Sequence, residues 1–170
     1  VVIVFPVCVH RVMGCDIGYI YKELEKRFPD VIFIRGFMDP VMQKRGTTPD
    51  QRLRKAMSDI IPKLPAKEDT VAFAGNDMPA SENDFKKILE FNAKTVKDTA
   101  DCRTLEEYLS VGESSLFICQ YPAGLMAAKA ITQRLDRKYI YCPLSFDFDT
   151  VEEEIRQSGL SVPDRFFEDG

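Results

Sequence analysis

Apolar and polar positions follow two different spacings along the chain, and the first 36 residues show both. Residues 1–7 form a nearly continuous apolar run, which predicts a buried strand of a parallel sheet. The next apolar residues recur at helical spacing and predict one apolar helix face, made of Ile17, Ile20, Tyr21, Leu24 and Phe28. Residues 31–34 are apolar again and predict the next strand. This strand–helix–strand order is typical of an α/β protein.

A second helix is predicted from its capping residues. Thr48 suits the N-cap, Pro49 suits the first helical position, and Gln51 completes a capping box. The apolar stripe of this helix consists of Leu53, Met57, Ile60, Ile61 and Leu64. A proline-containing, charged stretch follows at residues 62–69 and indicates a boundary between two lobes. We therefore predict that residues 1–65 are the carboxyl-terminal part of a first α/β domain.

The same alternation resumes after this stretch. Four strands are predicted, at residues 70–74, 95–98, 115–119 and 139–142. Helix caps are predicted at residues 81–84, 104–107 and 150–153, and a helix rich in small residues is predicted over residues 123–135. Repeated βα units predict two Rossmann-like lobes with mostly parallel sheets and helices on both faces. The middle α/β domain is predicted at residues 66–157, and residues 158–170 form a tail or begin a following domain.

Composition and charge exclude several classes of protein. Of the 170 residues, 45% are hydrophobic and 29% are charged, the net charge is −4, and a sizeable core is expected. The nearest approach to a basic run, Lys44-Arg45 with Arg52 and Arg54-Lys55, is interrupted and offset by acids, so nucleic-acid binding is not indicated. No apolar stretch approaches the ~20 residues of a membrane helix, and these residues show no signal-peptide pattern. We expect a cytoplasmic protein. Because Val1 already lies inside an apolar run, we also expect a piece of a longer polypeptide.

Two of the five cysteines stand where a predicted strand ends and a helix is about to begin, namely Cys8 and Cys119. Ligands of open α/β proteins collect at the carboxyl ends of the strands, and a nearby helix N-terminus favours a thiolate. Both cysteines are therefore candidate metal ligands. The alternative is ordinary packing, which we also expect for Cys102 and Cys142. The odd number of cysteines favours reduced thiols over a disulfide framework.

The loop after the first predicted strand offers further candidate ligands. Zinc is one alternative for this loop, with Cys8, His10, Cys15 and Asp16 as its ligands. In the competing interpretation His10 has no special role and Asp16 opens a helix, where the helix dipole favours an acid. Gly14 is expected to allow a close approach of the backbone. Walker A, GxGxxG and serine nucleophile motifs are absent, and a single histidine makes a catalytic triad improbable, so catalytic residues stay unassigned.

Several short motifs follow one another in an order that resembles one family. The first part of this order is Val7-Cys8, Gly14-Cys15-Asp16-Ile17, Arg35-Gly36-Phe37 and Arg45-Gly46. The second part is Asn83-Asp84-Phe85, Thr104-Leu105-Glu106-Glu107, residues 115–119 and Arg137-Lys138-Tyr139. Together they resemble the nitrogenase component 1-type oxidoreductases, which include the nitrogenase molybdenum–iron protein, its cofactor-assembly scaffold and the protochlorophyllide and chlorophyllide reductases. In that family the second motif reads Gly-Asp-Asp-Ile, so Cys15 replaces an aspartate.

The resemblance implies roles for four residues. Cys8 matches a cysteine that helps to hold the iron–sulfur cluster through which these complexes pass electrons, with Gly14 and Asp16 shaping the helix start beside it. Cys119 matches the position at which the catalytic nitrogenase subunit anchors its metal–sulfur cofactor, and thiolates suit such clusters. The parent protein would receive low-potential electrons from an ATP-dependent iron–sulfur reductase and pair with a homologous or identical subunit. Because the family's other ligands would lie outside this chain, no cluster is expected in the chain alone.

Two other interpretations stay open at this point. The protein could be a non-catalytic scaffold for cofactor assembly, or an interaction protein, on the same fold. It could also be a small-molecule-binding α/β module in which the cysteines are structural. Fold likeness does not separate these interpretations, because function depends on the site and not on the fold.

Overall fold

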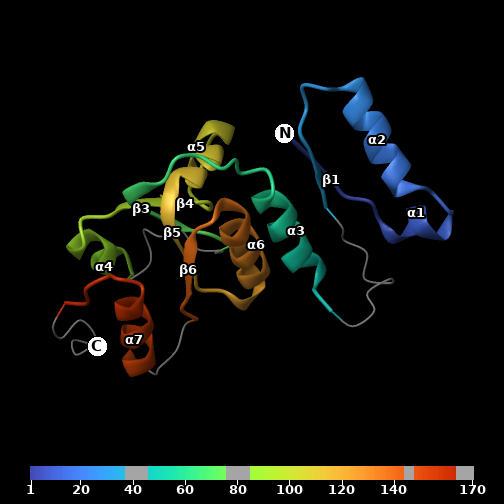
Figure 1. Cartoon of the computed structure of the whole chain (residues 1–170). Coiled ribbons are helices and arrows are strands. Elements are labelled where there is room, and N and C mark those ends of the chain that lie inside the picture. Colours follow the sequence, from blue (N-terminus) through green and yellow to red (C-terminus); the bar gives the residue numbers. More distant parts are fainter. Residues whose placement is uncertain (37–45, 76–84, 144–147, 164–170) are drawn as a thin grey trace.

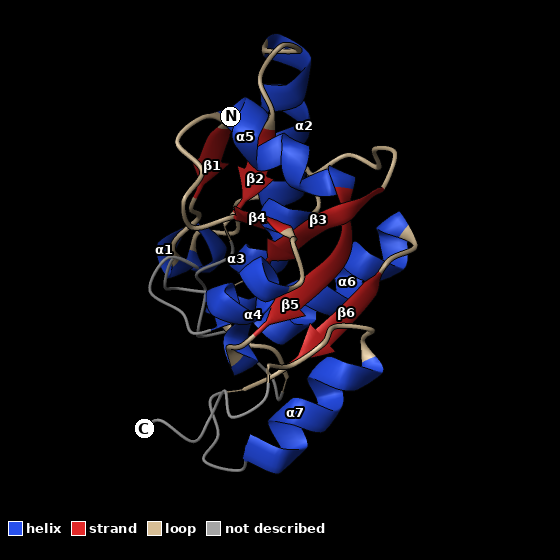
Figure 2. Cartoon of the chain, turned by 90° about the vertical axis from the view of Figure 1, so that its left-hand side faces the viewer, coloured by secondary structure: helices blue, strands red, loops and turns tan. Residues whose placement is uncertain are grey.

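The strands form two separate sheets, and all the strand pairings seen are parallel. The computed structural model describes residues 1–36, 46–75, 85–143 and 148–163, without the side chains of Arg11 and Phe148. The smaller sheet pairs β1 (Val2–Val4) with β2 (Phe33–Arg35). The larger sheet has the order β4-β3-β5-β6 and consists of β3 (Lys67–Phe73), β4 (Thr95–Asp98), β5 (Ser114–Cys119) and β6 (Lys138–Tyr141) (Figures 1 and 2). The predicted α/β class with parallel sheets is confirmed.

Helices alternate with these strands along the chain. They are α1 (Cys8–Val12), α2 (Ile17–Arg27), α3 (Pro49–Ser58), α4 (Phe85–Phe91), α5 (Leu105–Ser110), α6 (Leu125–Leu135) and α7 (Phe148–Gln157), with short 3-10 helices η2 (Val111–Glu113) and η3 (Pro122–Gly124). None of the helices in the described ranges is long and apolar enough to cross a membrane.

Local capping signals were reliable where the sequence shows a complete capping box. The Thr48 hydroxyl accepts a hydrogen bond from the Gln51 N–H, and the Gln51 side chain accepts one from the Thr48 N–H, so this predicted box is confirmed. The predicted box at Thr104 is confirmed in the same way. The cap predicted at Thr150 is wrong, because α7 begins two residues earlier. The cap predicted at residues 81–84 lies outside the described residues.

The four-stranded sheet has an apolar core on each face. One core joins alternate residues of β3 and β5 to α4 and α7, and it includes Phe73, Ile88 and Ile155. The other core joins the intervening residues to α6, and it includes Phe117 and Ile131. Side chains of a strand alternate between the two faces, so the central strands β3 and β5 contribute to both cores. Helices on both faces are what a parallel sheet requires.

The smaller sheet is much less buried than the apolar run of residues 1–7 predicts. Only Val2–Val4 are in β1, because Pro6 has no N–H to continue the ladder, and Val2 is 45% exposed. Of the predicted apolar face of α2, Tyr21 alone is buried. A two-stranded sheet with few contacts to its neighbouring helices offers too little apolar surface to bury its strands on both faces. The expectation of a buried first strand is therefore wrong.

Helix α3 lies between the two sheets (Figure 1). It packs against α6, and the Arg134 side chain from α6 donates a hydrogen bond to the Ser58 carbonyl oxygen at 2.9 Å. Ile61, just beyond α3, belongs to a core of the four-stranded sheet. The boundary at residue 65 stays a prediction, and the residues immediately before it pack on the second sheet.

Candidate functional site

The carboxyl edge of the four-stranded sheet contains a switch point between β3 and β5. The chain leaves β3 toward β4 on one side and leaves β5 toward β6 on the other side. In open α/β sheets this position is the usual place for a ligand. Here the two loops touch: a Cβ built on Gly124 would lie 2.5 Å from the Gly75 carbonyl oxygen. Only glycine allows this backbone contact, so the crevice between the loops is closed at that point.

Cys119 ends β5 beside this closed crevice and is completely buried. Its thiol donates a hydrogen bond to the Tyr121 carbonyl oxygen, with an Sγ–O distance of 3.4 Å. Burial raises the pKa of the Cys119 thiol to about 11, an effect that a backbone hydrogen bond with Tyr121 and the charge of Arg54 only partly oppose. At neutral pH the side chain is therefore a protonated, packed thiol. A metal would require its thiolate form and open space beside it.

The other two cysteines of this edge match the packing expected of them. Cys142 belongs to one core of the sheet, and burial raises its pKa to about 12. Cys102 is half-buried against the other core, and its thiol donates a hydrogen bond to the Asp98 carbonyl oxygen at 3.1 Å. Burial, followed by the charge of Glu107, raises the pKa of Cys102. These environments favour inert thiols over reactive ones.

The loop that carries Cys8 differs from this edge. Cys8 is the first residue of α1 and is half-buried, so its thiol is partly accessible. The Asp16 carboxylate accepts a hydrogen bond from the Tyr19 N–H at 3.0 Å and caps α2, as the helix-opening interpretation expects. Gly14 has a φ of +71°, and a Cβ built on it would meet no atom within 4 Å. Its role in the described structure is conformational, and the expected close approach is not seen.

The zinc alternative for this loop is not supported. The His10 ring nitrogen Nδ1 lies 3.2 Å from both the N–H and the carbonyl oxygen of Val7, and the Cys15 N–H donates to the His10 carbonyl oxygen. Across the described ranges, no three His, Cys, Asp or Glu side chains are grouped so that they could hold a metal ion. The loop is therefore held by backbone contacts.

An iron–sulfur cluster needs several thiolate ligands, and Cys8 and Cys119 differ in how well they could serve as such ligands. Cys8 fits as one ligand, because it is only half-buried, although it begins α1 and does not end β1 as the sequence predicted. Cys119 does not fit in this conformation, because its thiol is enclosed and hydrogen-bonded. The two cysteines follow strands of different sheets, so the structure gives no reason to place them in one site. Their assignment as ligands stays a prediction.

A second feature of the same edge was not predicted from the sequence. A cavity of about 220 Å³ lies among α3, α5 and α6, with Met57, Ala74, Thr99, Tyr108 and Ile131 among its lining residues. Burial raises the pKa of Tyr108 to about 12, and its hydroxyl makes no hydrogen bond with any described residue. The sequence held no signal for this cavity, because the lining residues come from elements far apart in the chain.

Comparison with known proteins identifies the fold. A solved structure of nitrogenase Cp1 at pH 5 matches with a TM-score of 0.62 at 17% sequence identity. The match covers 91% of this chain and 32% of the nitrogenase chain, so this chain spans about a third of that protein's length. No protein-family model and no curated protein matches the sequence. The chain therefore has a fold like that of nitrogenase component 1, and the resemblance is confirmed at the level of the fold.

Proposed function

We propose that this chain is part of a nitrogenase component 1-like oxidoreductase subunit that relays low-potential electrons through an iron–sulfur cluster. The observation that carries this proposal is the likeness of fold over 91% of the chain. The ordered motifs around Cys8 and Asp16 support it. The electron donor would be an ATP-dependent iron–sulfur reductase, and the partner would be a homologous or identical subunit.

Cys8 is the residue that we propose as a cluster ligand. Cys8 is only half-buried, and the loop around it is fixed by the left-handed turn at Gly14 and by the Asp16 cap of α2. When bound, the cluster would supply the redox chemistry, while these residues hold one ligand in position. The remaining ligands would come from parts of the protein beyond this chain or from a partner subunit.

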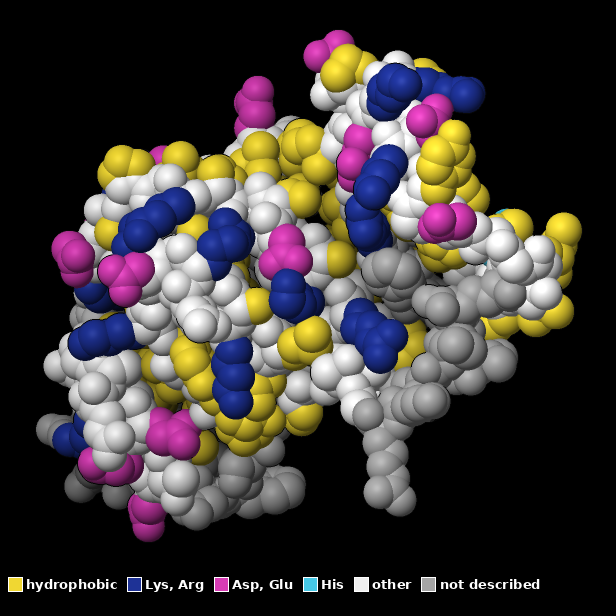
Figure 3. Space-filling view, turned by 45° about the vertical axis from the view of Figure 1, so that its right-hand side comes forward, with side chains coloured by type: hydrophobic (Ala, Val, Ile, Leu, Met, Phe, Trp, Pro, Cys, Tyr) yellow, Lys and Arg dark blue, Asp and Glu magenta, His cyan; other side chains and the backbone are white. Residues whose placement is uncertain are grey.

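The surface beside Cys8 is apolar and exposed, which supports a contact there with a partner subunit or with another part of the protein. Val7 and Val9, the neighbours of Cys8, are 49% and 52% exposed, and Val12 and Met13 are exposed still more. Figure 3 shows hydrophobic side chains along the outer surface of the part that carries α1 and α2. Exposed apolar patches often mark protein interfaces.

A role as a metal ligand would require two changes at Cys119. Its thiol would have to leave the Tyr121 oxygen and lose its proton before it could anchor a metal–sulfur cofactor. We therefore place the cluster ligand at Cys8 and expect packing to be the main role of Cys119 in this conformation.

Iron and sulfide analysis of the complete natural protein tests the proposal. The protein is purified without oxygen after co-expression with the candidate reductase. We expect iron, acid-labile sulfide and visible absorption of a cluster, and Cys8→Ala should lower the iron content. Cys102→Ala is the matched control, because it removes a half-buried thiol that packs beside the four-stranded sheet and should leave the iron content unchanged. A colourless, iron-free wild-type protein would overturn the proposal.

A small-molecule-binding module is the second candidate function, and the cavity at Tyr108 is the observation that favours it. The cavity combines mostly apolar lining with a hydroxyl that has no described partner, which suits a small neutral molecule carrying one hydrogen-bond acceptor. The iron-free protein would then bind an aromatic probe such as acetophenone, whose carbonyl oxygen can accept a hydrogen bond from the Tyr108 hydroxyl. Ala127→Leu, which fills the cavity, should abolish that binding.

A further inference from the structure

A groove of about 720 Å³ follows the outer margin of β6, the last strand of the larger sheet. Its floor is β6 itself, from Lys138 to Tyr141. One wall is α6, with Lys129, and the other wall is α7, with Glu154. Figure 2 shows β6 at one margin of the sheet, and within the described residues no strand lies beyond it. The groove is separate from the Cys8 loop and from the cavity at Tyr108.

The backbone of β6 has hydrogen-bonding groups that point away from the sheet. In a parallel ladder, every second residue of an edge strand bonds to its neighbour, and the residues between them point outward. The Cys142 N–H donates to the Cys119 carbonyl oxygen of β5 at 3.0 Å, so the residues two and four positions before Cys142 point toward β5 as well. The N–H and C=O groups of Tyr139 and Tyr141 therefore point outward. These outward groups have no hydrogen-bond partner within the described ranges.

The opposite margin of the sheet, formed by β4, is different. The Thr99 N–H donates to the Phe73 carbonyl oxygen of β3, so by the same alternation Asp98 points outward. The outward carbonyl oxygen of Asp98 already accepts hydrogen bonds from the Asp101 N–H at 3.2 Å and from the Cys102 thiol at 3.1 Å. The chain that follows β4 therefore covers part of that margin, whereas the described residues leave the margin of β6 open.

The groove along β6 carries more positive than negative charge. Its cations are Lys129, Arg137 and Lys138, and its acid is Glu154. The Arg137 guanidinium donates to main-chain carbonyl oxygens, among them that of Leu64 at 2.9 Å, so it contributes its charge but few free donors. Lys129 and Lys138 form no ion pair with any acid that the structure describes. An acidic ligand would complement this groove.

We propose that this groove binds an extended acidic peptide, which would pair with β6 as an additional strand of the sheet. Backbone pairing at a free sheet edge is a common way to bind a peptide, and the side chains of alternate residues then give the specificity. The peptide backbone would bond to Tyr139 and Tyr141. Its side chains on one face would lie beside Lys129, and those on the other face beside Lys138 and Glu154. None of these residues belongs to the proposed cluster site, so the groove and the electron relay can be tested independently.

A second copy of this chain fits the groove less well than a peptide does. It would present the same surplus of positive charge, so the two margins would repel each other. Lysine on an edge strand, here Lys138, is also a common guard against edge-to-edge pairing of folded proteins. An extended peptide needs to bring only its own backbone between α6 and α7, whereas a second β6 would bring two further helices.

Fluorescence polarisation of the complete protein with a labelled peptide tests this proposal. The peptide alternates valine and glutamate and is about six residues long, the usual length of a strand. We expect it to bind at least about 10-fold more tightly than the same peptide with lysine in place of glutamate. N-methylation of either all its valines or all its glutamates should abolish binding, because one of these sets donates to β6. No binding of the acidic peptide, or binding by both methylated forms, would overturn the proposal.

Two substitutions of Tyr139 separate its backbone from its side chain. Tyr139→Ala keeps the outward N–H, whereas Tyr139→Pro removes it and leaves the hydrogen bonds to β5 in place, since proline is tolerated on an edge strand. Tyr139→Pro should weaken binding of the acidic peptide about 5- to 10-fold relative to Tyr139→Ala. Equal binding by the two variants would contradict pairing at this edge.

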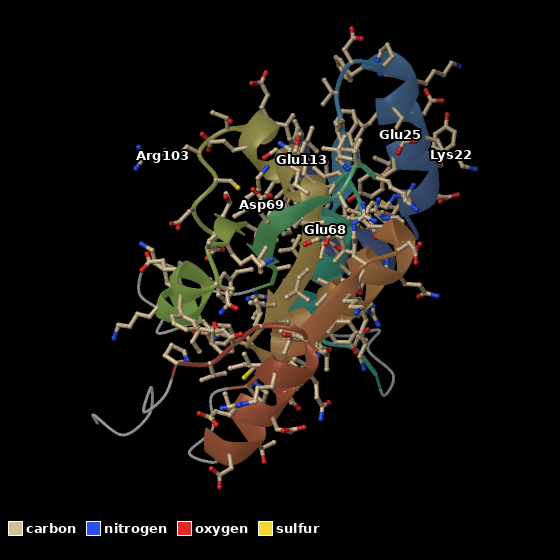
Figure 4. The ribbon with its side chains drawn as sticks, turned by 60° about the vertical axis from the view of Figure 1, so that its left-hand side comes forward. Lys22, Glu25, Glu68, Asp69, Arg103 and Glu113 are labelled. Atoms are coloured by element: carbon tan, nitrogen blue, oxygen red, sulfur yellow. The ribbon has the colours of Figure 1, made fainter. Side chains whose placement is uncertain are left out.

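Charge variants leave the backbone unchanged and guard against a folding defect in Tyr139→Pro. Lys129→Gln and Lys138→Gln should each weaken binding of the acidic peptide about 2- to 5-fold, as expected for exposed charges. Arg103→Gln is the matched control, because Arg103 is exposed and follows β4, at the opposite margin of the sheet from β6 (Figure 4). Equal weakening in all three charge variants would show attraction by net charge alone and overturn the proposal. A dimer in solution that dissociates in Tyr139→Pro would show that a second copy occupies the edge, and would also overturn it.

Discussion

The two sheets of this protein use the same strand–helix–strand pattern and reach opposite states of burial. In the amino-terminal layer, defined as residues 1–36, Val12 is 83% and Met13 is 72% exposed. In the four-stranded layer, defined as β3 to β6 with their helices, Phe73 and Phe117 are 0% exposed. An apolar pattern therefore predicts the element, whereas burial depends on how many other elements cover it.

The difference follows from the number of layers. Each face of the four-stranded sheet meets helices, so its strands are covered on both sides. The amino-terminal layer has two strands and keeps a single helical residue, Tyr21, in a buried position, where its hydroxyl donates a hydrogen bond to the Val4 carbonyl oxygen at 2.7 Å. Hydrophobic stabilisation is proportional to the area removed from water, so most of the stability resides in the larger layer.

The comparison is tested most strongly by deleting one phenylalanine from each layer. Phe117→Ala removes a fully buried ring from the four-stranded layer and should lower the free energy of unfolding by about 3–5 kcal/mol. Phe28→Ala removes a ring that is 51% exposed in the amino-terminal layer, and its cost should be about 1 kcal/mol or less. Urea unfolding followed by circular dichroism measures both values. Equal losses would mean that Phe28 is buried in the natural protein.

Thiol reactivity sharpens the same comparison. Cys8 and Cys15 are half-buried, while Cys119 and Cys142 are buried and hold their protons because burial raises their pKa values. With Ellman's reagent at pH 8, the two buried thiols should react about a hundredfold more slowly than the two in the amino-terminal layer, since they must wait for an opening event.

Two controls make this experiment decisive. Unfolded protein should show five thiols reacting together, which fixes the total. Cys119→Ala should remove one slow thiol and leave the fast phase unchanged. A fast reaction at Cys119 in the native protein would instead support an accessible cofactor position and contradict its burial.

Local signals and distant contacts were not equally predictable from the sequence. The capping box of Thr48 with Gln51 involves residues three apart, and the sequence predicted it correctly. The burial of Cys119 depends on loops that meet through Gly75 and Gly124, which no local pattern reveals. The contact between β2 and α3 is hidden from the sequence in the same way, because these two elements come together only in the folded chain.

The smallest expected effect concerns an ion-pair network that only the four-stranded layer has among the described residues. The Glu113 carboxylate contacts the ammonium groups of Lys67 and Lys97, each at 2.9 Å, and these hydrogen bonds lower the pKa of Glu113 below its usual 4.5. A carboxyl group with a lowered pKa in the folded state stabilises the protein above its unfolded pKa, and that contribution is lost as the pH falls through the folded value.

Glu113→Gln should therefore lower the unfolding temperature slightly at pH 7, and the difference from the wild type should shrink below pH 4.5 and in high salt. Glu23→Gln is the matched control in the amino-terminal layer, because the one ion pair of Glu23 within the described ranges is with the exposed Arg27, at 3.7 Å, and such a pair contributes little. An equal effect of the two substitutions at pH 7 would show that the Glu113 network adds nothing beyond an ordinary surface pair.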